Sequence, residues 1–123
     1  MADPTAPTGL DGEDAKLVVL ARAARSRAHA PSGVAEGAAV RDADGRTYSA
    51  ATVENGDPAL TTSALRGAVV AAASSGARTF EAAVVVTEGL PSEADLAVLR
   101  EFGVGVPVLL AGPDGVVRER LTT

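Results

Sequence analysis

The chain has 123 residues, the length of one domain with a single hydrophobic core. It contains no cysteine, which excludes disulfides, thiolate nucleophiles and thiolate metal sites. Its net charge of −5 argues against a nucleic-acid partner, because counterion release on a polyanion requires basic residues at the contact. The sequence shows neither a membrane-spanning apolar run nor a signal-peptide pattern, so we expect a soluble, cytoplasmic protein without a membrane partner.

The chain begins with a segment that lacks periodicity. Residues 1–12 predict a disordered N-terminal tail, and residues 13–123 predict the folded domain. From Glu13 a helix is expected, which Pro31-Ser32-Gly33 would end. Its apolar positions recur at helical spacing: Leu17, Leu20, Ala21, Ala24 and Ala28.

Two β-compatible runs follow, 34–40 and 46–53. Asp44-Gly45 between them predicts a hairpin. Thr62 or Ser63 can cap a second helix that extends to residue 75, where Gly76 suits its end. The apolar run 80–87 then predicts a strand that is buried on both faces.

A third helix is predicted after Ser92, which is well suited to cap it. Glu93 and Asp95 would lie in its first turn, where acidic side chains are favourable, and Gly103 would end it. Residues 106–110 predict another buried strand and 116–121 a short final one. The order α-β-β-α-β-α-β-β predicts an α/β fold with a mixed sheet and helices packed on its faces.

Several fragments, in order, resemble the cytidine deaminase family of small zinc-dependent nucleoside deaminases. Residues 52–55, Thr-Val-Glu-Asn, resemble the family's Asn-Val-Glu-Asn. Residues 63–68 align with Cys-Ala-Glu-Arg-x-Ala, and residues 91–95 match Pro-Cys-Gly-x-Cys. The resemblance covers about residues 13–120. It implies a cytidine deaminase-like three-layer α/β/α fold with a mixed five-stranded sheet.

The resemblance places Ser63, Ser92 and Asp95 at the three zinc-ligand positions and Leu65 at the position of the catalytic glutamate. Neutral hydroxyls are poor zinc ligands, and leucine cannot exchange protons. We therefore expect no metal, no other cofactor and no catalytic residue. The interpretation we favour is that both serines are helix caps. An alternative is that the two converging helix N-termini hold an anion or water.

A nucleoside site is the second feature that the resemblance implies. In the family the Asn and Glu of Asn-Val-Glu-Asn hold the ribose hydroxyls, so Thr52 and Glu54 are the candidate substrate-binding residues. Val34 stands where the family has a ring-stacking Phe. Glu54 can equally be a capping or exposed residue. His29, the only histidine, has no second ligand nearby and is expected to face solvent or the end of the first helix.

Three functions follow from these residues. The first is a non-catalytic, deaminase-like protein, a pseudoenzyme with a structural, regulatory or partner-binding role. The second is a weak nucleoside- or nucleotide-binding protein, and the third, by family resemblance only, is a cytidine deaminase. The resemblance also implies a homo-oligomer, a dimer or tetramer, with helix faces rich in Ala and Gly as subunit contacts.

Overall fold

The structure, a computed structural model, describes residues 10–123. In chain order its elements are α1 (Gly12–Arg25), β1 (Gly37–Asp42), β2 (Thr47–Ala51), the short 3₁₀ helix η1 (Pro58–Leu60), α2 (Ala64–Ser74), β3 (Phe80–Val86), α3 (Glu93–Arg100), β4 (Pro107–Ala111) and β5 (Val117–Thr122). The predicted order of helices and strands is confirmed, and η1 is the one element that the sequence patterns did not predict. None of the helices in this part of the chain combines the length and apolar character that crossing a membrane requires.

The first helix differs from its prediction at both ends. Residues 1–9 of the predicted tail lie outside the described residues, and Asp11 caps α1 by accepting the N–H of Asp14 at 2.8 Å. The helix therefore begins at Gly12, one residue before the predicted start. It ends at Arg25, before Pro31. There the N–H groups of Ser26, Arg27 and Ala28 bond carbonyls three residues earlier instead of four, so the α-helix gives way to tighter turns.

The five strands form one mixed sheet in the order β2-β1-β3-β4-β5. β3 and β4 are parallel, whereas the β1–β2, β1–β3 and β4–β5 pairs are antiparallel. β3 is buried along nearly its whole length, as its apolar run predicted. The Asp44-Gly45 hairpin is also confirmed, with Gly45 at a φ of 84° that a side chain would disfavour.

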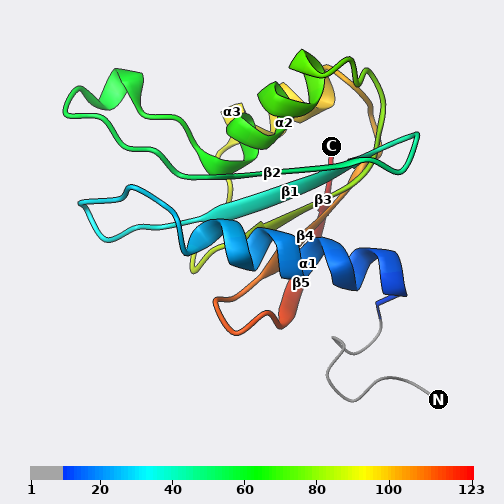
Figure 1. Cartoon of the computed structure of the whole chain (residues 1–123), viewed down its shortest axis with the longest axis horizontal. Coiled ribbons are helices and arrows are strands. Elements are labelled where there is room, and N and C mark those ends of the chain that lie inside the picture. Colours follow the sequence, from blue (N-terminus) through cyan, green and yellow to red (C-terminus); the bar gives the residue numbers. More distant parts are fainter. Residues whose placement is uncertain (1–9) are drawn as a thin grey trace.

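The sheet is the middle layer of three, and each face carries its own core. Figure 1 shows α1 on one side of the sheet and the α2–α3 pair on the other. On the α2–α3 side, Leu65, Val69 and Leu99 pack against residues of β1, β3 and β4. On the α1 side, Leu17 and Val18 pack against Val84, Val86 and Leu109. The predicted three-layer α/β/α fold is therefore confirmed.

α1 packs so closely on β1 that one position between them has no room for a side chain. A Cβ on Gly37 would clash with the backbone of Ala21 and of Arg25, so only glycine fits there. Two residues of the predicted apolar stripe were wrong. Ala28 lies beyond the end of α1 and is only half-buried, because the helix ends at Arg25. Leu20 is 36% exposed, while Val18 is buried in its place, because the contact is centred between the positions of Leu17 and Ala21.

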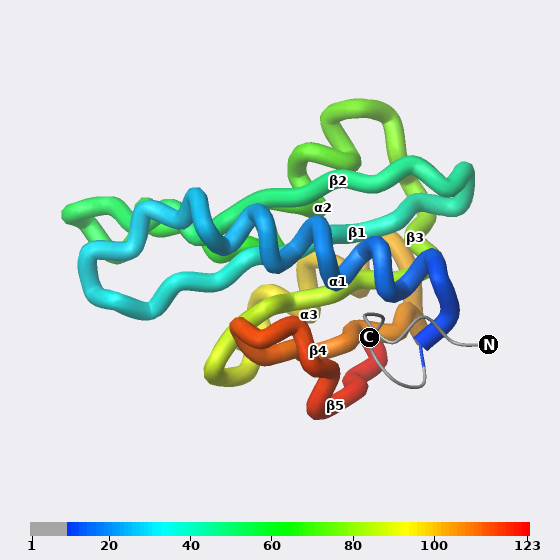
Figure 2. The backbone as a smooth tube through the Cα atoms, turned by 60° about the horizontal axis from the view of Figure 1, so that its bottom comes forward, coloured from blue at the N-terminus to red at the C-terminus, as the bar shows by residue number. Residues whose placement is uncertain are grey.

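Two loops extend from the sheet as an arm, formed by residues 26–36 and 52–62. They lie side by side in Figures 1 and 2. Backbone bonds join them, from the N–H of His29 to the carbonyl of Thr52 at 2.9 Å and from the N–H of Glu54 to the carbonyl of His29 at 2.8 Å. The side chain of His29 is exposed, as predicted. The arm places residues 52–54 beside the start of α2.

Candidate functional site

The site begins at the N-terminus of α2, where Ser63 is the cap. Its Oγ accepts the N–H of Arg66 at 3.3 Å, and its backbone is extended, as a cap requires. Leu65 lies in the first turn of the helix and is only 1% exposed, packed in the core on the α2–α3 side. The predicted capping role of Ser63 is thus confirmed.

The second part of the site is the start of α3. Ser92 Oγ accepts the N–H of Asp95 at 3.1 Å, and Asp95 Oδ2 accepts the N–H of Ser92 at 3.4 Å. This reciprocal pair is a capping box, which satisfies donors that a helix start otherwise leaves open. The predicted capping by Ser92 and the first-turn position of Asp95 are both confirmed.

The structure brings the two helix starts together through one side-chain contact. The hydroxyl of Ser63 donates to Asp95 Oδ1 at 2.7 Å, across 32 positions of the sequence. Asp95 is only 6% exposed, so this hydrogen bond to a carboxylate is shielded from water. The two groups touch directly, so the carboxylate of Asp95 itself supplies negative charge at the two helix starts, and the alternative of a bound anion or water stays a prediction.

The candidate nucleoside-binding residues lie next to this pair of helix starts. Val53 and Thr62 exchange two backbone hydrogen bonds of 3.0 Å, which holds residues 52–54 against the segment that enters α2. Thr52 is buried, and its Oγ1 accepts the N–H of Glu36 at 3.0 Å. Glu54 Oε1 accepts the N–H of Ser32 at 3.0 Å. Both side chains are therefore already bonded to the backbone of the residue 26–36 loop.

One polar contact in this region was not predicted from the sequence. Thr87, directly after β3, is 1% exposed, and its hydroxyl donates to Glu36 Oε2 at 2.7 Å while accepting the N–H of Gly89 at 3.0 Å. Ligands of open α/β sheets bind beyond the carboxyl ends of the parallel strands. The sequence carries one signal of this contact, a polar residue directly after the apolar run of β3. Its partner, Glu36, is 51 residues away, so no local pattern links the two.

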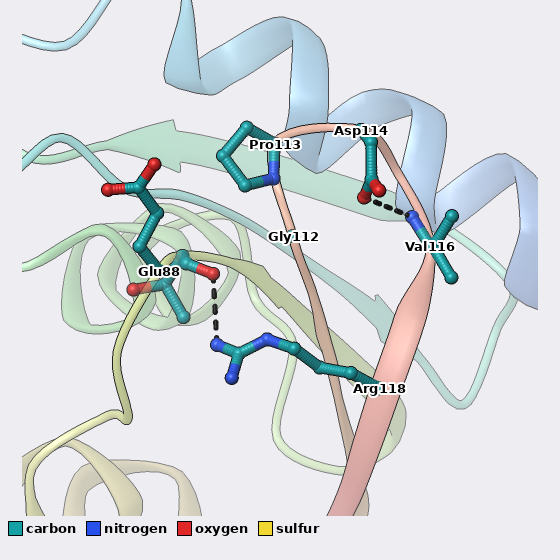
Figure 3. A pocket seen from close by; sticks show the side chains of 7 residues that line it. Glu88, Gly112, Pro113, Asp114, Val116 and Arg118 are labelled. Carbon is teal, nitrogen blue, oxygen red and sulfur yellow. Dashed lines mark hydrogen bonds between the residues drawn. The ribbon is translucent and has the colours of Figure 1, made fainter.

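A pocket of about 530 Å³ lies at the same edge, past the carboxyl ends of β3 and β4 (Figure 3). Arg118 reaches along it, and its Nη2 donates to the carbonyls of Thr87 at 3.0 Å and Gly89 at 2.6 Å. Asp114 Oδ1 accepts the N–H of Val116 at 3.0 Å within the turn before β5. The pocket is lined by Thr87, Glu88, Gly112, Pro113, Asp114, Val116 and Arg118, and so contains none of the predicted site residues.

Known proteins with similar sequences and folds identify the family of this chain. The chain belongs to the cytidine deaminase-like family, which matches residues 10–115. A cytidine deaminase of Sporosarcina psychrophila is 37% identical over 110 residues, which span 85% of this chain and 81% of that protein. The crystal structure of cytidine deaminase from Burkholderia pseudomallei is similar with a TM-score of 0.80 at 34% identity, covering 87% of this chain and 90% of that one. That of the Mycobacterium tuberculosis enzyme gives 0.74 at 30% identity, covering 89% and 91%.

The family implies a zinc ion, so the donors at the paired helix starts must be compared with what zinc requires. Zinc sites in proteins use thiolate, imidazole or carboxylate ligands, three of them in a catalytic site. Here the cluster offers one carboxylate and two serine hydroxyls, and both carboxylate oxygens already accept hydrogen bonds. Among residues 10–123, no group of three His, Cys, Asp or Glu side chains could hold a metal ion. The residues present do not fit zinc.

Proposed function

We propose that this protein is a non-catalytic member of the cytidine deaminase-like family, with a structural, regulatory or partner-binding role. The observation that carries the proposal is the hydrogen bond between Ser63 and Asp95 at the paired helix starts. By the resemblance these residues stand at metal-ligand positions, yet here they are bonded to each other. Leu65, at the position of the family's acid–base glutamate, is buried among apolar side chains and has no proton to exchange.

The test is elemental analysis of the purified full chain together with a deaminase assay. We expect zinc far below one equivalent and no conversion of cytidine to uridine. A zinc content near one equivalent together with turnover would contradict the proposal and identify a cytidine deaminase, the activity after which the relatives are named. The Sporosarcina psychrophila relative is a suitable positive control.

A second candidate function is weak nucleoside binding at Thr52 and Glu54. The backbone pairing of Val53 with Thr62 supports it, because it keeps Glu54 close to the start of α2. Against strong binding, the carboxylate of Glu54 already accepts the N–H of Ser32. Val34, at the position of the ring-stacking Phe, is exposed and offers no aromatic face.

Isothermal calorimetry with cytidine and uridine tests this second function. We expect weak, saturable binding that Glu54→Ala abolishes and that Glu88→Ala, a carboxylate outside the proposed site, leaves unchanged. Absence of heat with the unaltered chain at high nucleoside concentration would reject nucleoside binding. It would leave the non-catalytic proposal intact, because that proposal does not require a ligand.

We further propose that the chain forms a homo-oligomer, a dimer or tetramer. Large apolar side chains exposed on the outer helix faces support this, among them Val19 on α1 and Val70 on α2. An assembly would remove these side chains from water. Light scattering coupled to size exclusion should give a multiple of the 12.2 kDa chain mass. A strict monomer at all concentrations would contradict this part of the proposal.

A further inference from the structure

Two helices of the same layer start beside each other, and this arrangement has an electrostatic cost. The first turn of a helix carries unpaired N–H groups and a partial positive charge. The starts of α2 and α3 are joined by the contact between Ser63 and Asp95, so their positive ends lie close together. A negative group shared by both ends would offset their repulsion.

Asp95 is placed to be that group. Its carboxylate is buried, accepts the Ser63 hydroxyl at 2.7 Å from α2 and accepts the Ser92 N–H at 3.4 Å in its own helix. Ser63 Oγ in turn accepts the N–H of Arg66. A continuous path of hydrogen bonds therefore leads from the first turn of α2 to the first turn of α3 through a single pair of side chains.

The geometry points to Asp95 as a metal-free structural joint that holds the N-termini of α2 and α3 together. It occupies the place that the family resemblance assigns to a zinc ligand, while its contacts join two helices directly. The α2–α3 layer of this chain is assembled without a metal, and Ser63 and Asp95 stabilise the fold as a coupled pair beyond their two separate caps.

A double-mutant cycle measures this coupling in the full chain. Ser63→Ala and Asp95→Asn should each raise the unfolding equilibrium constant about 10-fold or more. Ser63→Ala removes the hydrogen bond to the buried carboxylate, and Asp95→Asn removes the charge and one of the two acceptor oxygens. The double variant should be about 10-fold more stable than the two single effects added together predict. Ser63→Ala combined with Glu93→Gln is the matched control. Glu93 lies in the same first turn but is exposed, so that pair should be additive.

Further measurements separate a joint from two independent caps and from a metal site. Ser63→Thr keeps both the hydroxyl and the cap, so its melting temperature should be close to that of the unaltered chain and above that of Ser63→Ala. This comparison keeps the test valid if Asp95→Asn fails to fold. A chelator should leave the melting temperature of the unaltered chain unchanged, and added zinc should not rescue Asp95→Asn. Additive effects of Ser63→Ala and Asp95→Asn, or a chelator-induced loss of stability, would overturn the inference.

Discussion

Replacing the three polar residues at the paired helix starts with cysteine would test whether they stand at former metal-ligand positions. The variant carries Ser63→Cys, Ser92→Cys and Asp95→Cys together. Thiolates bind zinc strongly at about 2.3 Å, and three of them supply the ligand number of a catalytic site. We expect the purified variant to bind about one equivalent of zinc, whereas the unaltered chain binds far less.

The loss of stability in the metal-free variant can be worked out from the contacts that the substitutions remove. Loss of two serine caps costs about 1 kcal/mol each, and loss of the hydrogen bond between Ser63 and Asp95 about 1.5–3 kcal/mol. The metal-free variant should therefore be about 3.5–5 kcal/mol less stable, a large part of the 5–15 kcal/mol typical of a domain. Zinc at about 100 times its dissociation constant would return about 2.7 kcal/mol, seen as a rise in melting temperature.

The assay combines thermal melts with and without zinc, elemental analysis, and the absorption band of thiolate-bound cobalt. The variant with Ser63→Cys and Ser92→Cys alone is the control and should bind the metal more weakly. The full variant should still fail to deaminate cytidine, because Leu65 has no proton to exchange. Identical melts with and without zinc, together with no bound metal, would refute the assignment of these positions.

Three further predictions concern the framework around the site. In urea denaturation, Gly37→Ala should destabilise the fold by about 1–3 kcal/mol or more, because its Cβ would meet the backbone of α1. Gly12→Ala is the control, because the Cβ added there contacts nothing. Equal losses of stability in the two variants would contradict the packing argument. Arg41→Met should also destabilise the fold. Burial opposes the charge of Arg41, but its hydrogen bonds to carboxylates of α1 and β3 raise its pKa and hold it ionised, so its loss leaves those carboxylates without their partner. A melting temperature unchanged by the substitution would contradict this. Thr87→Val should cost about 1–3 kcal/mol by leaving Glu36 without its donor, and a neutral result would show that this contact does not stabilise the edge of the sheet.

Much of the fold could be predicted from local sequence patterns, because the residues that start, form and end each helix or strand lie within or next to it. The apolar run before Thr87 predicted a buried strand, and Asp44-Gly45 predicted the hairpin. Ser63 and Ser92 predicted helix starts because a hydroxyl that bonds the third N–H is a local arrangement within four residues. The errors also had local origins. The spacing in the first helix suited Leu20 as well as Val18, and only the position of the sheet decided which of them is buried.

The paired helix starts show most clearly what the sequence determines and what the tertiary structure decides. The sequence alone determined which atoms are available there: no cysteine in the chain, hydroxyls at two positions, one carboxylate, and a leucine where the resemblance places the family's glutamate. Only the tertiary structure decided that Ser63 and Asp95, 32 positions apart, bond each other, and that Thr87 meets Glu36 across 51. The reason is physical. Capping and strand formation depend on neighbours along the chain, whereas contacts between elements depend on how the sheet and helices pack, which no short stretch of sequence contains.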